Sequence, residues 1–292
     1  MDKVPKKYIH AVDVDIFLDS IFYSAAETGF SASLIEKDYY CSLLLDRLFQ
    51  DEIELVFKGG TCLSKVYFDF YRLSEDLDFV IPVSKSTTKS TRREKIEPIK
   101  KLIDELPLVI PGIESYSALA GHNQSRQYIA YLLYHSVVME KEEQIKLEIG
   151  LREPLLKPFE HKQVRTISNN PLSEISLYPE FSVQVMNLQE ALAEKVRAAL
   201  TRREPAIRDF YDLQLAAQTN NIDFFNTAFL KMVATKLAVP GNEPIDISPD
   251  RKEELDRQIE TQLKSVLQPR DFEKFNLDYA YQMVVELAAK IS

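Results

Sequence analysis

Two short stretches of the sequence carry residues whose types and spacing suit phosphate and metal chemistry. Asp76 and Asp78 stand one residue apart in the apolar run DLDFVI, and the diglycine Gly59-Gly60, followed by Thr61, precedes them. Alternate residues of a strand face the same side, so the two carboxylates point together, about 7 Å apart along the backbone. Both can therefore bind one pair of Mg²⁺ ions, which lie about 3.5–4 Å apart in two-metal sites. A site with only oxygen ligands favours Mg²⁺ or Mn²⁺ over Zn²⁺.

The diglycine supplies the complementary half of such a site. Glycine tolerates positive φ and lets backbone N–H groups approach a ligand closely. A turn that leads into a helix offers several free N–H donors to a phosphate, and Thr61 is expected to cap that helix and add a hydroxyl. Alone, a glycine pair is more often a plain turn, and Asp-x-Asp is more often a solvated strand face. Their order along the chain predicts a phosphate-and-metal site.

The surrounding sequence predicts the elements that position these residues. We expect strands at 55–57, 76–81, 127–138 and 144–149, a turn at 140–143, and a further edge strand at 181–185. We expect helices at 12–29, 33–49, 92–105, 188–202, 207–218, 222–237, 249–266 and 271–290. The helix at 33–49 opens with the capping-box pattern Ser33-x-x-Glu36.

This order of elements predicts an α/β (α+β) fold with two parts. Residues 153–180 hold four prolines and predict an irregular segment, so we place a boundary there. Residues 1–160 are expected to form a catalytic domain with N-terminal helices. Residues 161–292 are expected to form a mainly helical lobe that completes the active site.

Composition bounds the class of protein. With 292 residues, 45% hydrophobic and 28% charged, the chain is expected to be a soluble globular protein. No run approaches a transmembrane span, and residues 1–15 lack the apolar core of a signal peptide, so we expect a cytoplasmic protein without a membrane partner. Cys41 and Cys62 are expected to be buried thiols, and the four histidines lack zinc-ligand spacing.

The net charge of −9 argues against broad, non-specific coating of nucleic acid, but two segments are locally basic. Residues 85–101 hold seven basic residues against two acidic ones, and residues 195–208 hold five against one. Each segment is either a contact for RNA or a solvated helix face.

The central stretch resembles a known family. Lys58-Gly59-Gly60-Thr61, followed by Arg72-x-Ser74-Glu75-Asp76-Leu77-Asp78-Phe79, is similar to the signature of the AbiEii/MenT-like nucleotidyltransferase toxins. These belong to the DNA polymerase β-like nucleotidyltransferase superfamily. Glu36-Lys37-Asp38 also resembles a family element, although we expect a structural role for it. The resemblance runs from about 33 to 213 and implies a polymerase β-like core with a small mixed sheet, N-terminal helices and a C-terminal helical lobe.

The resemblance also implies roles for individual residues. Glu148 lies in a Lys-x-Glu pattern and is the candidate third carboxylate, the alternative being an exposed strand face. The implied metal ligands are Asp76, Asp78 and Glu148. The implied nucleotide-binding residues are Lys58, Gly59, Gly60, Thr61, Ser74, Lys195 and Arg197. Asp209 and Asp212, in RDFYDL, would support Lys195 or orient the acceptor, and we count Lys195, Asp209 and Asp212 with the carboxylates as catalytic candidates.

The function that the resemblance implies is Mg²⁺-dependent (or Mn²⁺-dependent) transfer of an NMP from an NTP to an acceptor hydroxyl. The implied acceptor is the 3′ end of tRNA. The implied role is that of the toxin in a toxin–antitoxin, abortive-infection system, held in check by an antitoxin protein. Two alternatives stay open: a nucleotidyltransferase that modifies a protein acceptor, and a non-catalytic nucleotide-binding regulator.

Overall fold

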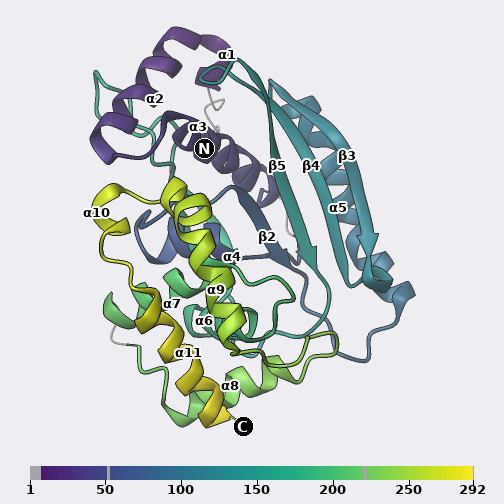
Figure 1. The fold of residues 1–292 in the computed structure, drawn as a ribbon. Helices are drawn as coiled ribbons and strands as arrows, with labels where there is room; N and C mark the ends of the chain where they lie inside the picture. Colours follow the sequence, from purple (N-terminus) through teal and green to yellow (C-terminus); the bar gives the residue numbers. More distant parts are fainter. Residues whose placement is uncertain (1–7, 51–52, 220–221, 292) are drawn as a thin grey trace. The chain divides into compact units, whose positions relative to one another are not determined.

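Figure 1 shows the computed structural model of the chain, which describes residues 8–50, 53–219 and 222–291. The chain divides into two compact units. The first comprises residues 1–152 and 160–185, and the second comprises residues 153–159 and 186–292. The expected boundary after residue 160 therefore differs from this division, because strands β6 and β7 complete the sheet of the first unit. Residues 1–7, part of the segment that we considered for a signal peptide, lie outside the described residues.

One mixed sheet is the scaffold of the first unit. Within the described residues it has seven strands in the order β3–β4–β5–β2–β1–β7–β6. The strands are β1 (Val56–Lys58), β2 (Asp76–Val80), β3 (Ile113–His122), β4 (Gln127–Ser136), β5 (Lys141–Gly150), β6 (Glu160–Val164) and β7 (Phe181–Val185). β2 runs antiparallel to β1 and parallel to β5, and β1 runs parallel to β7. The predicted strand at 181–185 is confirmed, but β6 rather than β7 forms the edge.

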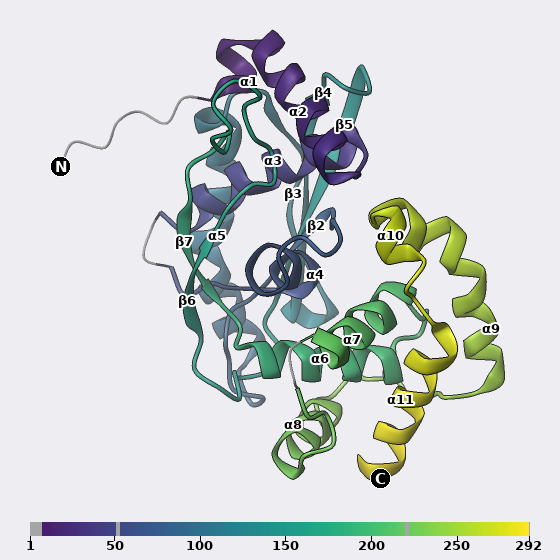
Figure 2. The ribbon, with the colours of Figure 1, turned by 90° about the vertical axis from the view of Figure 1, so that its left-hand side faces the viewer.

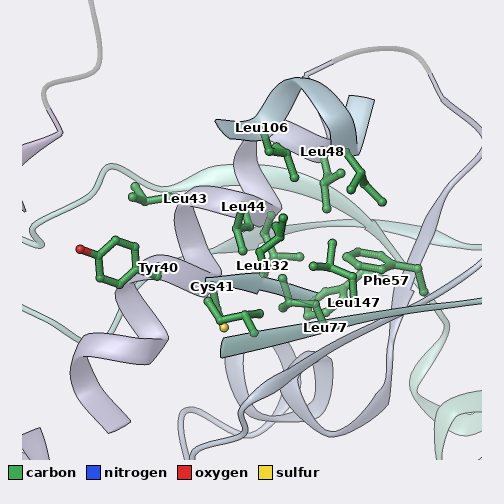
Figure 3. Close-up of a cluster of buried hydrophobic side chains, with 14 of the residues drawn as sticks. Tyr40, Cys41, Leu43, Leu44, Leu48, Phe57, Leu77, Leu106, Leu132 and Leu147 are labelled. Atoms are coloured by element: carbon green, nitrogen blue, oxygen red, sulfur yellow. The ribbon is translucent and has the colours of Figure 1, made fainter. Parts of the chain in front are cut away.

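The helices of the first unit are α1 (Ile9–Val12), α2 (Val14–Thr28), α3 (Ala32–Leu48), α4 (Gly59–Cys62) and α5 (Lys89–Val109), with a π-helical turn at Leu63–Tyr67 and a 3₁₀ turn at Asn123–Ser125. Of these, α3 and α5 pack on one face of the sheet (Figure 3). In Figure 3, Leu44 and Leu48 of α3 pack with Leu106 of α5 over Leu77 and Leu147 of the sheet. Because side chains alternate along a strand, Asp76 and Asp78 face away from this core.

Three local predictions in the first unit are wrong. Ser31, not Ser33, caps α3, and Glu36 makes no capping box because its carboxylate is buried and accepts hydrogen bonds from Ser136 and from the Val137 amide. The turn between β4 and β5 falls at 137–140, where Glu140 has a positive φ, so β5 begins earlier than expected. α5 continues to residue 109 although it contains prolines.

Two strands were not foreseen. β3 pairs with β4 through irregular register shifts, and β6 lies in the segment expected to be irregular. Both cysteines are buried, as predicted. Among the described residues, no helix is long and apolar enough to cross a membrane.

The second unit is helical. Its α-helices are α6 (Leu188–Thr201), α7 (Ile207–Thr219), α8 (Thr227–Leu237), α9 (Pro249–Gln258), α10 (Pro269–Phe272) and α11 (Leu277–Ile291). α6 packs on α7 and α8, and α11 packs against all three (Figure 2). Two predicted helices are split: a π turn at Ile259–Leu263 and a 3₁₀ turn at Lys264–Val266 follow α9, and residues 273–276 separate α10 from α11. The mixed α/β class is confirmed.

Candidate active site

The diglycine turn lies directly against the carboxylate of Asp78. Gly59 has a φ of +80°, and a Cβ added there would lie 2.3 Å from Asp78 Oδ2. A side chain at position 59 would thus meet both backbone strain and a steric clash, and only glycine fits. The pairing of β1 with β2 produces this approach, since it places Lys58 opposite Asp78. The phosphate half and the cation half of the predicted site are therefore adjacent.

The second glycine makes room for a buried arginine. A Cβ at Gly60 would lie 2.3 Å from Arg72 Nη2 and 3.3 Å from Ser74 Oγ. Arg72 is 2% exposed, and the hydroxyl of Ser64 donates a hydrogen bond to its carbonyl oxygen. The guanidinium of Arg72 and the hydroxyl of Ser74 therefore both lie against the turn at Gly60.

Thr61 does not cap the helix that follows the turn. Lys58 occupies the cap position, where no side chain makes a capping hydrogen bond. The Thr61 side chain is buried, and its hydroxyl donates to the carbonyl oxygen of Asp76. This bond ties the turn to β2, so the expected cap is wrong, and in this structure Thr61 positions the strand that carries the acids.

Strand register brings the third predicted carboxylate alongside the acid pair. Asp78 is the partner of Glu148 across the parallel strands β2 and β5, and Asp76 is the partner of Lys146. Burial raises the pKa of Asp78 to about 6, and the negative charge of Glu148 adds to this effect, whereas Lys58 opposes it. The two carboxylates are therefore close enough to repel each other.

Glu148 is held by two donors. Lys146 Nζ donates to Glu148 Oε2 at 2.6 Å, and Gln127 Nε2 donates to Glu148 Oε1 at 2.6 Å. Burial alone would raise the pKa of Glu148, but the hydrogen bonds and the charge of Lys146 outweigh it and lower the pKa. The Glu148 side chain is 28% exposed, and its role as the third carboxylate stays a prediction.

The donor set fits a divalent cation in chemistry and in strand register. Asp76 and Asp78 share a face, Glu148 lies across from Asp78, and all three offer only oxygen ligands, as Mg²⁺ prefers. Within the described residues, however, no three acidic, histidine or cysteine side chains converge closely enough to hold a metal ion. Glu148 points to Lys146 and Gln127 instead.

The Glu36-Lys37-Asp38 element is buried rather than exposed at the start of a helix. Lys37 Nζ lies 2.9 Å from Glu75, the residue before Asp76, and Asp38 Oδ1 lies 2.6 Å from the buried Lys65. The element therefore ties α3 to the two ends of the connector between the diglycine and the acid pair. This is the structural role that we expected.

The second unit carries the later motif residues in its own cluster. Lys195 Nζ lies 2.7 Å from Asp209 Oδ1 and 2.8 Å from Asp212 Oδ2, and Arg202 pairs with Asp209 at 3.1 Å. Asp209 and Asp212 are buried, and 13% of the Lys195 side chain is exposed. The structure thus brings together the three residues that the motif linked. Their role in chemistry stays a prediction.

Arg197 belongs to a separate, buried network. Its guanidinium lies 2.5 Å from Glu153, and its side chain is 11% exposed. Lys236, which is fully buried, lies 2.7 Å from Glu190, 3.1 Å from Glu194 and 3.2 Å from Glu153. These contacts give Arg197 a structural role in this structure, so we leave it out of the proposed nucleotide contacts.

Several residues around these sites escaped sequence reasoning. Gln127 lies in a strand whose polar side chains carried no motif, and Arg72 was only part of a pattern. Lys236 could have been noticed, because it follows Phe229 and Val233 at core spacing in a predicted helix, where a lysine needs a buried partner.

Comparison with known proteins agrees with this geometry. The family model described as "Nucleotidyl transferase AbiEii toxin, Type IV TA system" matches residues 43–283. JHP933 from Helicobacter pylori shares 16% sequence identity and a TM-score of 0.51 over 90% of this chain and 93% of its own. A second H. pylori protein, to which nucleotidyltransferase activity is attributed, has the same identity and TM-score over 90% of this chain and 96% of its own. At this identity the two structures show the fold alone.

No curated protein sequence gives a significant match. The family match nevertheless spans most of the chain, including the diglycine turn, the three carboxylates and the Lys195 cluster. The resemblance inferred from the motifs is thereby confirmed. The chain belongs to the AbiEii family of nucleotidyltransferase toxins of type IV toxin–antitoxin systems.

Proposed function

We propose that the protein transfers an NMP from an NTP to the 3′-terminal hydroxyl of tRNA, and that a divalent cation, Mg²⁺ or Mn²⁺, assists the reaction. The close approach of Gly59 to Asp78 carries this proposal, because it joins a turn suited to phosphate with carboxylates suited to a cation. As a member of a toxin–antitoxin family, the protein would be restrained by an antitoxin. We expect it to act in the cytoplasm, where NTPs and tRNA are found.

The reaction forms a bond between the acceptor oxygen and the α-phosphorus, breaks the bond to the β-phosphate and releases pyrophosphate and a proton. Backbone N–H groups of Gly59 and Gly60 would hold phosphate oxygens, with Ser74 beside them. Asp76, Asp78 and Glu148 would hold the cation, which supplies charge neutralisation and activation of the hydroxyl. Thr61 and Arg72 keep the turn and β2 in place for this task.

Exposed basic residues of the first unit favour an RNA acceptor. Lys85, Lys89, Arg93 and Lys101 are exposed, and the last three lie on α5, where Lys89 and Arg93 are neighbours one turn apart. Arg92 does not belong to this surface, because its guanidinium is buried and donates to the carbonyl oxygens of Thr87 and Gln124. A cationic helix face binds the phosphates of RNA with strong salt dependence.

The test is incubation of the purified protein with each NTP, labelled at the α-phosphate, with Mg²⁺ and total tRNA. We expect label on tRNA, and we expect it to vanish in a folded Asp76→Asn/Asp78→Asn variant. Lys89→Glu/Arg93→Glu should weaken labelling of tRNA without weakening the binding of NTP. Label on added cell protein instead of tRNA would establish the protein acceptor.

Binding of NTP without transfer to either acceptor would favour the nucleotide-binding regulator, and failure to bind NTP would refute the site. The triphosphate contact of Lys195 stays a prediction of the motif. Lys195→Met should raise the KM for NTP if it is correct, and Asp212→Asn should act in the same direction through the lost support of the ammonium.

A further inference from the structure

We propose that Lys146 is an internal counter-ion that competes with a divalent cation for Glu148. This inference rests on the proposed function, because it concerns the same carboxylates. The observation behind it is the 2.6 Å contact between Lys146 Nζ and Glu148 Oε2, which engages the carboxylate expected to complete the metal site. A cation that takes this oxygen of Glu148 as a ligand must compete with the ammonium of Lys146 for its negative charge.

The position of Lys146 in the sheet places its positive charge beside the carboxylate face, which is the sheet surface that carries Asp76, Asp78 and Glu148. It is the β5 partner of Asp76, two residues from Glu148 on the same side of the strand. Burial would lower its pKa, but the hydrogen bond and the charges of Glu148, Asp76 and Asp78 outweigh burial and raise the pKa. The ammonium contacts Glu148 and is close enough to Asp76 and Asp78 to offset part of the mutual repulsion of the three acids.

The other oxygen of Glu148 has a fixed donor. Gln127 Nε2 donates to it, and Asn123 Nδ2 donates at 3.0 Å to the Oε1 of Gln127, which orients the amide. Arg92, from α5, donates to the carbonyl oxygen of Gln124 in the same turn. Glu148 is thus held between a neutral amide, which a cation site can retain, and a positively charged lysine, with which a cation must compete.

A competing ammonium has a measurable consequence. Removing it takes one positive charge from beside the site, so a divalent cation binds more tightly, whereas the fold without added cation loses a stabilising contact. A lysine that merely positioned Glu148 as a ligand would give the opposite result, weaker binding of the cation. The direction of the change in affinity therefore distinguishes competition from positioning.

The experiment measures Mn²⁺ binding to the full chain by electron paramagnetic resonance, together with thermal unfolding with and without Mn²⁺. We expect Lys146→Met to bind Mn²⁺ at least about fivefold more tightly than the wild type, and Lys146→Arg to bind it as the wild type does. Lys141→Met is the matched control, since Lys141 pairs with Glu143 on the same strand at 2.9 Å but is 56% exposed. It should leave Mn²⁺ affinity unchanged.

Unchanged or weaker binding of Mn²⁺ by a folded Lys146→Met variant would overturn the inference and leave the proposed function intact. If Lys146→Met fails to fold, Lys146→Gln replaces it, with the same expected direction. Absence of Mn²⁺ binding in the wild type, in Lys146→Met and in Lys146→Arg would overturn the metal assignment of the proposed function, and the inference with it.

Discussion

Replacing Gly59 by alanine tests whether the diglycine turn and the carboxylates form one site. The added Cβ would lie 2.3 Å from Asp78 Oδ2, whereas ordinary contacts of this kind begin at 3.4 Å, so the carboxylate must move by about 1 Å. A displacement of about 1 Å in a catalytic group can reduce the rate by about 100-fold, which corresponds to about 2.7 kcal/mol. We therefore expect transfer activity to fall by about two orders of magnitude.

The substitution also strains the backbone, and controls separate this cost from the effect on Asp78. Gly112 has a φ of +74° but an open environment, with the closest atom to an added Cβ at 3.9 Å. Gly112→Ala should thus cost about 1–2 kcal/mol of stability from the left-handed conformation alone, and should keep its activity. At Gly150 an added Cβ would meet its nearest atom at 3.8 Å, so Gly150→Ala should change neither the stability nor the activity.

The assay combines thermal unfolding with the rate of pyrophosphate release from NTP in the presence of tRNA. We expect both variants to lose stability, Gly59→Ala more than Gly112→Ala because of the added clash with Asp78, whereas only Gly59→Ala loses activity. Activity of Gly59→Ala within about threefold of Gly112→Ala would refute the reasoning, because a shift of about 1 Å in a catalytic carboxylate should not be silent.

Three further predictions concern charges whose surroundings the structure defines. Asp78→Asn should abolish transfer and yet stabilise the fold by about 1–3 kcal/mol at pH 7.5, because burial and Glu148 raise the pKa of Asp78 and make its charge unfavourable. Urea unfolding measures this change, and a variant less stable than the wild type would contradict the prediction. Lys236→Met should destabilise the protein by about 3–5 kcal/mol, since it leaves Glu190 and its neighbours buried without their ammonium, whereas Lys252→Met, at an exposed pair, should cost under about 1 kcal/mol. Burial lowers the pKa of His10, so the unfolded state takes up the proton first as the pH falls below about 6.5. The free energy of unfolding should therefore fall by up to about 1.4 kcal/mol per pH unit. In urea unfolding between pH 7.5 and 5.5, the free energy of unfolding of His10→Gln should depend less on pH than that of the wild type.

Local patterns explain why the centre of the candidate site could be predicted. The alternation around Asp76 and Asp78 defines which side chains face the core, and the rarity of glycine makes a diglycine before a helix informative. Helix ends were harder to predict: we expected a helix at 92–105, whereas α5 spans Lys89–Val109 and contains Pro98 and Pro107.

Contacts between distant segments explain what the sequence could not show. Glu148 meets Asp78 only because β5 pairs in parallel with β2, and nothing in either strand encodes that register. The spacing of Lys236 suggests burial, but its partner Glu190 reaches it only when α8 packs on α6. The family motif, rather than residue patterns, supplied Glu148.

Internal lysines change how substitutions of the acidic residues should be interpreted. In each unit, carboxylates with candidate or structural roles lie within hydrogen-bond distance of a lysine, as Glu148 does of Lys146, Asp212 of Lys195 and Glu190 of Lys236. Removing such an acid leaves a lysine without its partner, so loss of activity alone does not identify a catalytic group. Asp76 is exposed, unlike Asp78 and Glu148, so we expect its replacement to perturb folding less than replacement of Glu148. Its conservative variant therefore separates chemistry from stability more cleanly than a Glu148 variant does.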